Sequence, residues 1–219
     1  MRAPSVKPQY GPTLSELLIP RWRTASVGLR SLVLAVAVVV LAGAVAFEIL
    51  RTRNTVFAHS GPPVSFSLNY AEPLHAVKTP AGAYMRVEAR TSAGRLREWF
   101  EVDPLKLGSD TGQTSGSLPV YATNYIAGLG RRVRDFSLQS ETKTRVNLVA
   151  GYTMTYSGRF DGQLMYGRIV LLVPTLTGQP NGVILNMGIR PSASLDYSPD
   201  QVASADVLER PFRSFRFGS

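Results

Sequence analysis

The chain has 219 residues, a formal net charge of +9 and no cysteine, and these properties limit its chemistry. Without cysteine it forms no disulfide, ligates no iron–sulfur cluster and has no thiolate nucleophile. The positive charge alone does not indicate nucleic-acid binding, which needs clustered basic residues, commonly with aromatic side chains for stacking. Only Arg131, Arg132 and Arg134 cluster here, so we expect no nucleic-acid partner.

Residues 31–47 form an apolar run of 17 residues without a charge. A single segment crosses a bilayer only as a helix, and about 17 to 25 apolar residues span the hydrocarbon. We therefore expect a transmembrane helix over residues 27–50, after a disordered cytoplasmic arm over residues 1–26 that is rich in Pro, Ser and Arg. The alternative is a signal peptide cleaved after Ala46, because Ala44-Val45-Ala46 matches the small-residue pattern of a cleavage site.

Basic residues on the two sides of this run predict its orientation. Five precede the run, and three lie in the thirty residues after Leu50: Arg2, Lys7, Arg21, Arg23 and Arg30 before it, and Arg51, Arg53 and Lys78 after it. Cytoplasmic flanks retain Lys and Arg, and large polar domains are translocated regardless of their charge. We therefore expect a single-pass protein in the cell membrane, with a cytoplasmic N-terminus and an extracytoplasmic C-terminal domain.

After the run, residues 51–63 have mixed polarity and end in Gly61-Pro62-Pro63, which is typical of a stiff tether. We expect the folded domain to cover residues 64–219. Its first residues alternate between apolar and polar, as in a half-buried strand, with Val64, Phe66, Leu68 and Tyr70 on one face. The same alternation predicts strands over residues 84–90 and 96–102, joined by a hairpin loop.

The middle of the domain predicts one helix and four further strands. Residues 117–130 indicate a helix, because their apolar side chains form one stripe that comprises Leu118, Tyr121, Ala122, Tyr125, Ile126 and Leu129. Strands are expected over residues 134–146, 148–160, 163–173 and 183–189. Asp161-Gly162 marks the turn between the second and the third of these strands.

The last segment predicts a C-terminal helix from Pro199, since Ser198 suits the N-cap and Gln201 the third position of a capping box. Leu208, Phe212 and Phe215 recur at i, i+4 and i+7, and we expect them to seal one edge of the sheet. The order of elements describes an α+β fold, in which helices flank an antiparallel sheet, preceded by one transmembrane helix.

Four segments of the domain resemble the PsbP-like fold: VSFSLNY followed by Pro73, GYTMTYSG, YGRIVLLVP and the closing RPFRSFRF. The resemblance covers roughly residues 64–217 and implies a PsbP-like sandwich. The superfamily includes photosystem II extrinsic proteins, a Ran-binding nuclear import factor and the extracytoplasmic LpqN-type lipoproteins of mycobacteria. Its members act as binding or assembly modules without a shared catalytic set, so the resemblance implies a binding module. The chain lacks the lipoprotein cysteine, so its anchor differs from the LpqN type.

Carboxylates provide the main enzymatic alternative. Glu101 and Asp103 share one face of an expected strand, with Glu98 nearby. Two carboxyl groups about 5 to 9 Å apart are the catalytic pair of glycoside hydrolases. A solvated sheet face with cross-strand ion pairs is the simpler interpretation, in which Leu96, Phe100 and Val102 point inward. The alternative function is therefore an envelope glycan or lipid hydrolase or transferase that uses Glu101 and Asp103.

We expect no catalytic residue, no metal site and no cofactor. His59 and His75 are too few for a zinc site without cysteine, and neither has a serine and a carboxylate beside it. Asp110 lacks the dense oxygen ligands of a calcium loop, and residues 108–116 lack the Gly-Lys-Ser/Thr of a phosphate-binding loop.

Tyrosines supply the candidate ligand-binding residues. Tyr152 and Tyr156 lie on one face of an expected strand, and Tyr166 lies on its expected partner. A tyrosine-lined concavity suits a lipid, a glycan or a peptide, although such a stripe is more often core packing. We therefore predict a non-enzymatic, membrane-anchored protein whose extracytoplasmic domain binds or scaffolds an envelope protein, lipid or glycan.

Overall fold

The computed structural model describes residues 26–51, 54–107, 114–174, 181–191, 197–204 and 206–218. The chain divides between Arg51 and Thr52 into two units. The first contains α2 (Val27–Arg51). Within the described residues, no helix has both the length and the apolar character needed to cross a membrane. Apart from Ser26, the arm expected over residues 1–26 lies outside the described residues.

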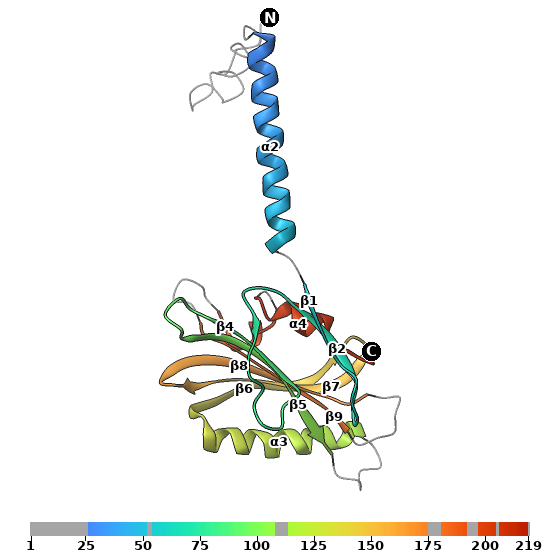
Figure 1. Ribbon diagram of the computed structural model, residues 1–219. Helices are drawn as coiled ribbons and strands as arrows, with labels where there is room; N and C mark the ends of the chain where they lie inside the picture. The colour runs from blue at the N-terminus through green and yellow to red at the C-terminus, as the bar shows by residue number, and fades with distance from the viewer. Residues whose placement is uncertain are drawn as a thin grey trace, which may run out of the picture. The chain divides into compact units, whose positions relative to one another are not determined.

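The second unit is built on a seven-stranded sheet with the order β3-β4-β5-β9-β8-β7-β6 (Figure 1). All neighbouring strands are antiparallel. The strands are β3 (His75–Ala76), β4 (Met85–Arg90), β5 (Leu96–Lys106), β6 (Arg134–Val146), β7 (Val149–Phe160), β8 (Gln163–Leu172) and β9 (Asn181–Ile189). The α+β fold with an antiparallel sheet, predicted from alternation, is therefore confirmed. Asp161 and Gly162 form the β7–β8 turn with φ angles of 49° and 75°, which favour these two residue types.

A smaller sheet, with the order β1-β2-β10, consists of β1 (Thr55–His59), β2 (Phe66–Tyr70) and β10 (Arg216–Phe217). Residues 55–59 fall within the expected tether, yet they form a strand. They do so because β1 pairs with β2 along its whole length and Phe57 packs against the core. The folded unit therefore begins before Val64.

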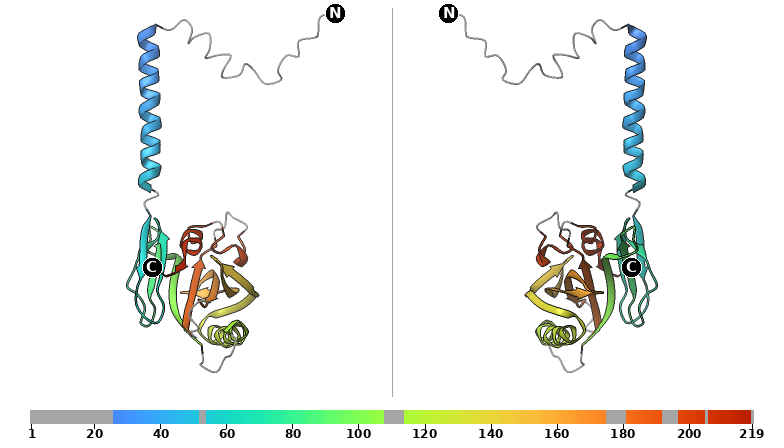
Figure 2. Two further views of the ribbon diagram at one scale, coloured as in Figure 1. Left: turned by 90° about the vertical axis from the view of Figure 1, so that its right-hand side faces the viewer. Right: turned by 90° about the vertical axis from the view of Figure 1, so that its left-hand side faces the viewer.

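Helices and the small sheet cover the two faces of the large sheet. In Figures 1 and 2, α3 (Thr114–Arg132) lies along one face, and α4 (Glu209–Ser214) and the small sheet lie on the other. The large sheet separates two hydrophobic cores, because successive side chains of a strand point to opposite faces. In β8, Val170 enters one core and Leu171 the other.

The prediction of a C-terminal helix from Pro199 is wrong in the length of the helix. Residues Pro199–Gln201 form only one turn, η1. Two residues later, Ala203 has a positive φ angle of 61°, which does not continue a right-handed helix. Asp206 accepts hydrogen bonds from the backbone N–H groups of Ala203 at 3.0 Å and Leu208 at 2.8 Å. The Asp206 carboxylate thus holds a turn in place of a continuous helix, and α4 begins only at Glu209.

The closing segment nevertheless seals the sheet, as predicted. Leu208 and Phe215 are buried, with 0% and 1% of their surface exposed, and Phe212 packs at the edge of the same core. Ser214 fixes α4 to β2, because its Oγ accepts a hydrogen bond from the Asn69 N–H at 2.8 Å and donates one to the Arg210 carbonyl at 2.8 Å.

Candidate functional site

A cavity of about 440 Å³ opens on the α3 face of the large sheet. The helix α3 packs against β6 and β7, so the polar side chains that β4, β5 and β9 direct to this face line open space. The helix also supplies part of the wall. The residues that the site uses are Arg86, Trp99, Glu101, Asp103, Tyr125, Leu129, Arg132, Tyr156, Ile184 and Asn186.

Two aromatic rings of the cavity wall lie over glycines of neighbouring strands. One cross-strand row runs from Trp99 on β5 through Gly188 and Gly167 to Tyr156 on β7. A Cβ at Gly188 would overlap the Trp99 ring, and a Cβ at Gly167 would overlap the Tyr156 ring. The two glycines therefore provide the space that the two rings occupy.

Glu101 and Asp103 form a hydrogen-bonded carboxyl pair in the cavity. Glu101 accepts a hydrogen bond from Arg86 Nη1 at 2.7 Å and is only 8% exposed. Burial, followed by the charge and the hydrogen bond of Glu101, raises the pKa of Asp103 to about 7, and Arg86 and Arg132 oppose this shift. Below about pH 7, the Asp103 carboxyl group therefore carries a proton, which lies in its hydrogen bond with Glu101.

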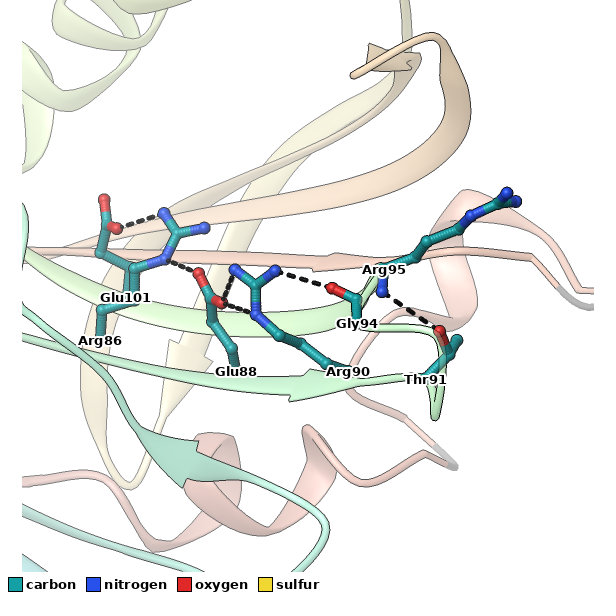
Figure 3. A network of polar contacts seen from close by, with 7 residues as sticks. All are labelled: Arg86, Glu88, Arg90, Thr91, Gly94, Arg95 and Glu101. Atoms are coloured by element: carbon teal, nitrogen blue, oxygen red, sulfur yellow. Dashed lines mark hydrogen bonds and ion pairs between the residues drawn. The ribbon is translucent and has the colours of Figure 1, made fainter.

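Arg86 is held by a network of ion pairs along β4 (Figure 3). Its Nε donates to Glu88 Oε1 at 2.8 Å, and Arg90 Nε donates to Glu88 Oε2 at 2.9 Å. The Arg86 guanidinium also lies 5.9 Å from the centre of the Trp99 ring. These contacts fix the guanidinium against Glu101. One cross-strand ion pair, Arg86–Glu101, is therefore present as expected on this sheet face, but the face is not solvated there, because Glu88 and Glu101 are buried.

Two polar groups of the cavity were not predicted from the sequence. The Asn186 side chain lies opposite Glu101 in the sheet, and its Oδ1 is buried without a hydrogen-bond partner among the described residues. Arg132 donates from Nε to the Gly128 carbonyl at 3.2 Å, and it forms no ion pair within the described part of the chain. The only sequence signal for Asn186 is that it interrupts the apolar run of β9.

The three predicted tyrosines do not share one surface. Tyr156 lines the cavity, and Tyr152 packs at the edge of the core beneath α3. Tyr166 lies on the opposite face, where its ring stacks on Tyr197 at 6.5 Å between centroids. The register explains this difference, because Tyr156 pairs with Gly167 and not with Tyr166. No group of three or more His, Cys, Asp or Glu suited to a metal occurs among the described residues.

The fold has counterparts among solved structures. LpqN of Mycobacterium tuberculosis, described as involved in cell envelope biogenesis, matches with a TM-score of 0.54 and 13% identity over 80% of this chain and 96% of LpqN. CyanoP, the PsbP of Synechocystis sp. PCC 6803, matches with a TM-score of 0.48 and 13% identity over 75% of this chain and 93% of CyanoP. The Ran-binding protein Mog1p of Saccharomyces cerevisiae matches with a TM-score of 0.45 and 12% identity over 75% of this chain and 95% of Mog1p.

Comparison of sequences adds no closer relative. No protein-family model matches the sequence, and no curated protein sequence is similar to it. The structural similarity to LpqN covers nearly all of that protein, at an identity that establishes the fold alone. The resemblance inferred from the strand motifs, which included the LpqN type, is thereby confirmed at the level of the fold, and the chain has the fold of LpqN.

Proposed function

We propose that the chain is a single-pass membrane protein whose extracytoplasmic domain binds a component of the cell envelope without chemical turnover. The observation that carries the proposal is the cavity on the α3 face, which combines an apolar wall with a few converging polar groups, as small-molecule sites do. The part that LpqN plays in cell envelope biogenesis supports the choice of compartment.

The anchor in this proposal is the segment of residues 27–50. Its support is the charge-free run of residues 31–47 in the sequence, together with the exposure of apolar side chains between Leu32 and Leu41. Leu32, Val39 and Leu41 are 61%, 69% and 70% exposed, so these side chains are not buried in a core. Apolar surface of this kind is typical of a contact with membrane or partner.

Single cysteines test the orientation cleanly, because the chain has none of its own. Ala93 lies exposed in the hairpin loop between β4 and β5. We expect Ala93→Cys to react with a membrane-impermeant maleimide on intact cells, and Ser5→Cys to react only after the cells are opened. The reverse labelling pattern would show that the domain is cytoplasmic. A mature chain that starts at Phe47 would show that the apolar segment is a cleaved signal peptide.

The contact between Glu101 and Asp103 argues against the hydrolase alternative. A raised pKa suits Asp103 as a general acid, but the two carboxyl groups bond to each other. Two-carboxylate glycoside hydrolysis needs them about 5 to 9 Å apart, on opposite sides of the reacting carbon. Glu101 is also bound to Arg86, which stabilises its charge.

Filling the cavity should remove the bound molecule. Ala81 is exposed and lines the cavity, so Ala81→Trp should occupy its mouth without disturbing either core. We expect the full chain, purified in detergent from its own membrane, to carry a non-protein molecule detectable by native mass spectrometry. Ala81→Trp should lose this molecule, and Ala150→Trp should retain it, because Ala150 is also exposed and does not line this cavity.

The same preparation decides between binding and catalysis. An unchanged set of bound molecules in Ala81→Trp would contradict the assignment of the cavity. Turnover of the bound molecule by the wild type, absent from a Glu101→Gln/Asp103→Asn variant, would contradict the non-enzymatic proposal and favour the hydrolase or transferase.

A further inference from the structure

The charges of the cavity leave one group of each sign without a charged partner. Four charged side chains line it: Arg86, Glu101, Asp103 and Arg132. Arg86 and Glu101 form an ion pair at 2.7 Å. Asp103 and Arg132 form no ion pair within the described residues, although Arg132 lies near enough to lower the pKa of Asp103. The cavity thus offers one carboxyl group and one guanidinium group for a ligand.

The carboxyl end of the cavity is a cluster of hydrogen-bond acceptors. Glu101 and Asp103 are two residues apart on β5, and Asn186 is the cross-strand neighbour of Glu101 on β9. The buried Asn186 Oδ1 has no donor among the described residues. A primary ammonium group carries three N–H donors and no acceptor, which matches three acceptor groups on one sheet face. A quaternary ammonium carries no donor and matches none of them.

We infer that the cavity binds a small zwitterion, with a primary ammonium group among Glu101, Asp103 and Asn186 and an anionic group against Arg132. Leu129 and Ile184 provide apolar wall for the carbon atoms between the two charges. The inference rests on the proposed binding function and names its ligand class. On binding, the proton shared by the carboxyl pair leaves to solvent, and the ammonium group takes its place between the two carboxylates.

This exchange makes the affinity depend on pH. The titratable and charged groups that face Asp103 are Arg86 on β4, Glu101 on β5, and Tyr121, Tyr125 and Arg132 on α3. The carboxyl pair ionises fully only above a pKa of about 7. Affinity for the ammonium group should therefore be constant above about pH 8. Below about pH 6 it should fall by a factor approaching ten per pH unit, because each unit lowers the ionised fraction of the site about tenfold.

Two matched probes test whether the cavity recognises the N–H donors of the ligand's ammonium group. Glycerophosphoethanolamine carries a primary ammonium and a phosphodiester, and glycerophosphocholine differs only in its quaternary ammonium. Calorimetry on the full chain in detergent should show binding of the first probe and at least about tenfold weaker binding of the second. Proton release should accompany binding at pH 7, measured as a dependence of the heat on the buffer's ionisation enthalpy.

Variants test the two ends of the site separately. Asp103→Asn keeps the shape and removes the charge, and it should weaken glycerophosphoethanolamine binding by about ten- to a hundredfold and abolish proton release. Arg132→Gln should weaken binding by about fivefold, since its charge is exposed. Arg131→Gln, on the same helix and outside the cavity wall, should leave the affinity unchanged.

Equal affinity for the two probes would overturn the inference, as would an unchanged affinity in an Asp103→Asn variant that unfolds at the wild-type temperature. Loss of the native molecule in Ala81→Trp, combined with no binding of glycerophosphoethanolamine, would leave the proposed function standing and reject the zwitterion. If the probe binds, phosphatidylethanolamine in the micelle identifies the source. If the lipid binds more tightly than glycerophosphoethanolamine, the natural ligand is a lipid headgroup. If the lipid binds more weakly, the natural ligand is a free solute.

Discussion

Phe215→Ala is expected to lower the free energy of unfolding of the domain by about 3 to 5 kcal/mol, which is typical for truncation of a buried aromatic ring. Phe215 is 1% exposed, stacks on Phe66 at 5.5 Å between ring centres and meets Phe217 edge-on at 5.2 Å. It closes the core between the two sheets. A loss of this size is a large part of a typical stability of about 5 to 15 kcal/mol. Urea denaturation of the chain from Asn54 onward should show a midpoint lower by about 2 M.

Arg213→Ala is the matched control for Phe215→Ala, because it lies two residues away. Its side chain is 74% exposed and forms an ion pair with Glu209 at 2.9 Å, so its removal should cost less than about 1 kcal/mol. Small and equal shifts for the two variants would show that residues 208–217 are a loose extension and do not close the core.

Gly188→Ala is expected to destabilise the domain by about 1 to 3 kcal/mol, the usual cost of overpacking. The added methyl group would overlap the Trp99 ring, which is 3% exposed and also packs on Phe160 at 5.2 Å between ring centres. The ring has to move into the cavity. Trp99 is the only tryptophan in the domain, so its fluorescence should report both the displacement and the lower denaturation midpoint.

Gly128→Ala is expected to change the stability of the domain in the opposite direction. Gly128 lies in α3, where an added methyl group meets only Arg132 at 3.9 Å. Alanine in a helix interior is favoured over glycine by about 0.5 to 1 kcal/mol, so this variant should be slightly more stable than the wild type. If Gly188→Ala also proved neutral or stabilising, the close packing of Trp99 on Gly188 would be wrong.

Local pattern predicted most of the fold, because the strands are either alternating or continuously apolar runs that turn residues separate. The hairpin at Asp161-Gly162 and the helix around residues 117–130 followed from residue types that suit their backbone conformations. Residues 55–59 and the turn after Gln201 did not follow, because tertiary contacts decide both. β1 exists through its pairing with β2, and Asp206 reaches the backbone of Ala203 to end η1.

The site was predictable only in part. Phe100 and Val102 point into the core between the sheets, as alternation requires, and Glu101 points the other way. Leu96 was expected to point inward, but it lines the cavity, because the register between β4 and β5 shifts at Ala89 and Arg90. Glu101 faces a cavity and not open solvent, because α3 packs nearby on the same face of the sheet. No local sequence pattern specifies where α3 packs.

The bond between Asn69 and Ser214 joins residues 145 positions apart in the chain. Ribosomes add about 5 to 20 residues per second, so the cover of β2 is synthesised on the order of ten seconds after β2 itself. During that interval the apolar side chains of β2, such as Phe66 and Leu68, lack the Phe215 side of their core. The nascent chain therefore exposes apolar surface of β2 throughout this interval, and the domain closes only after residues 208–217 have been synthesised.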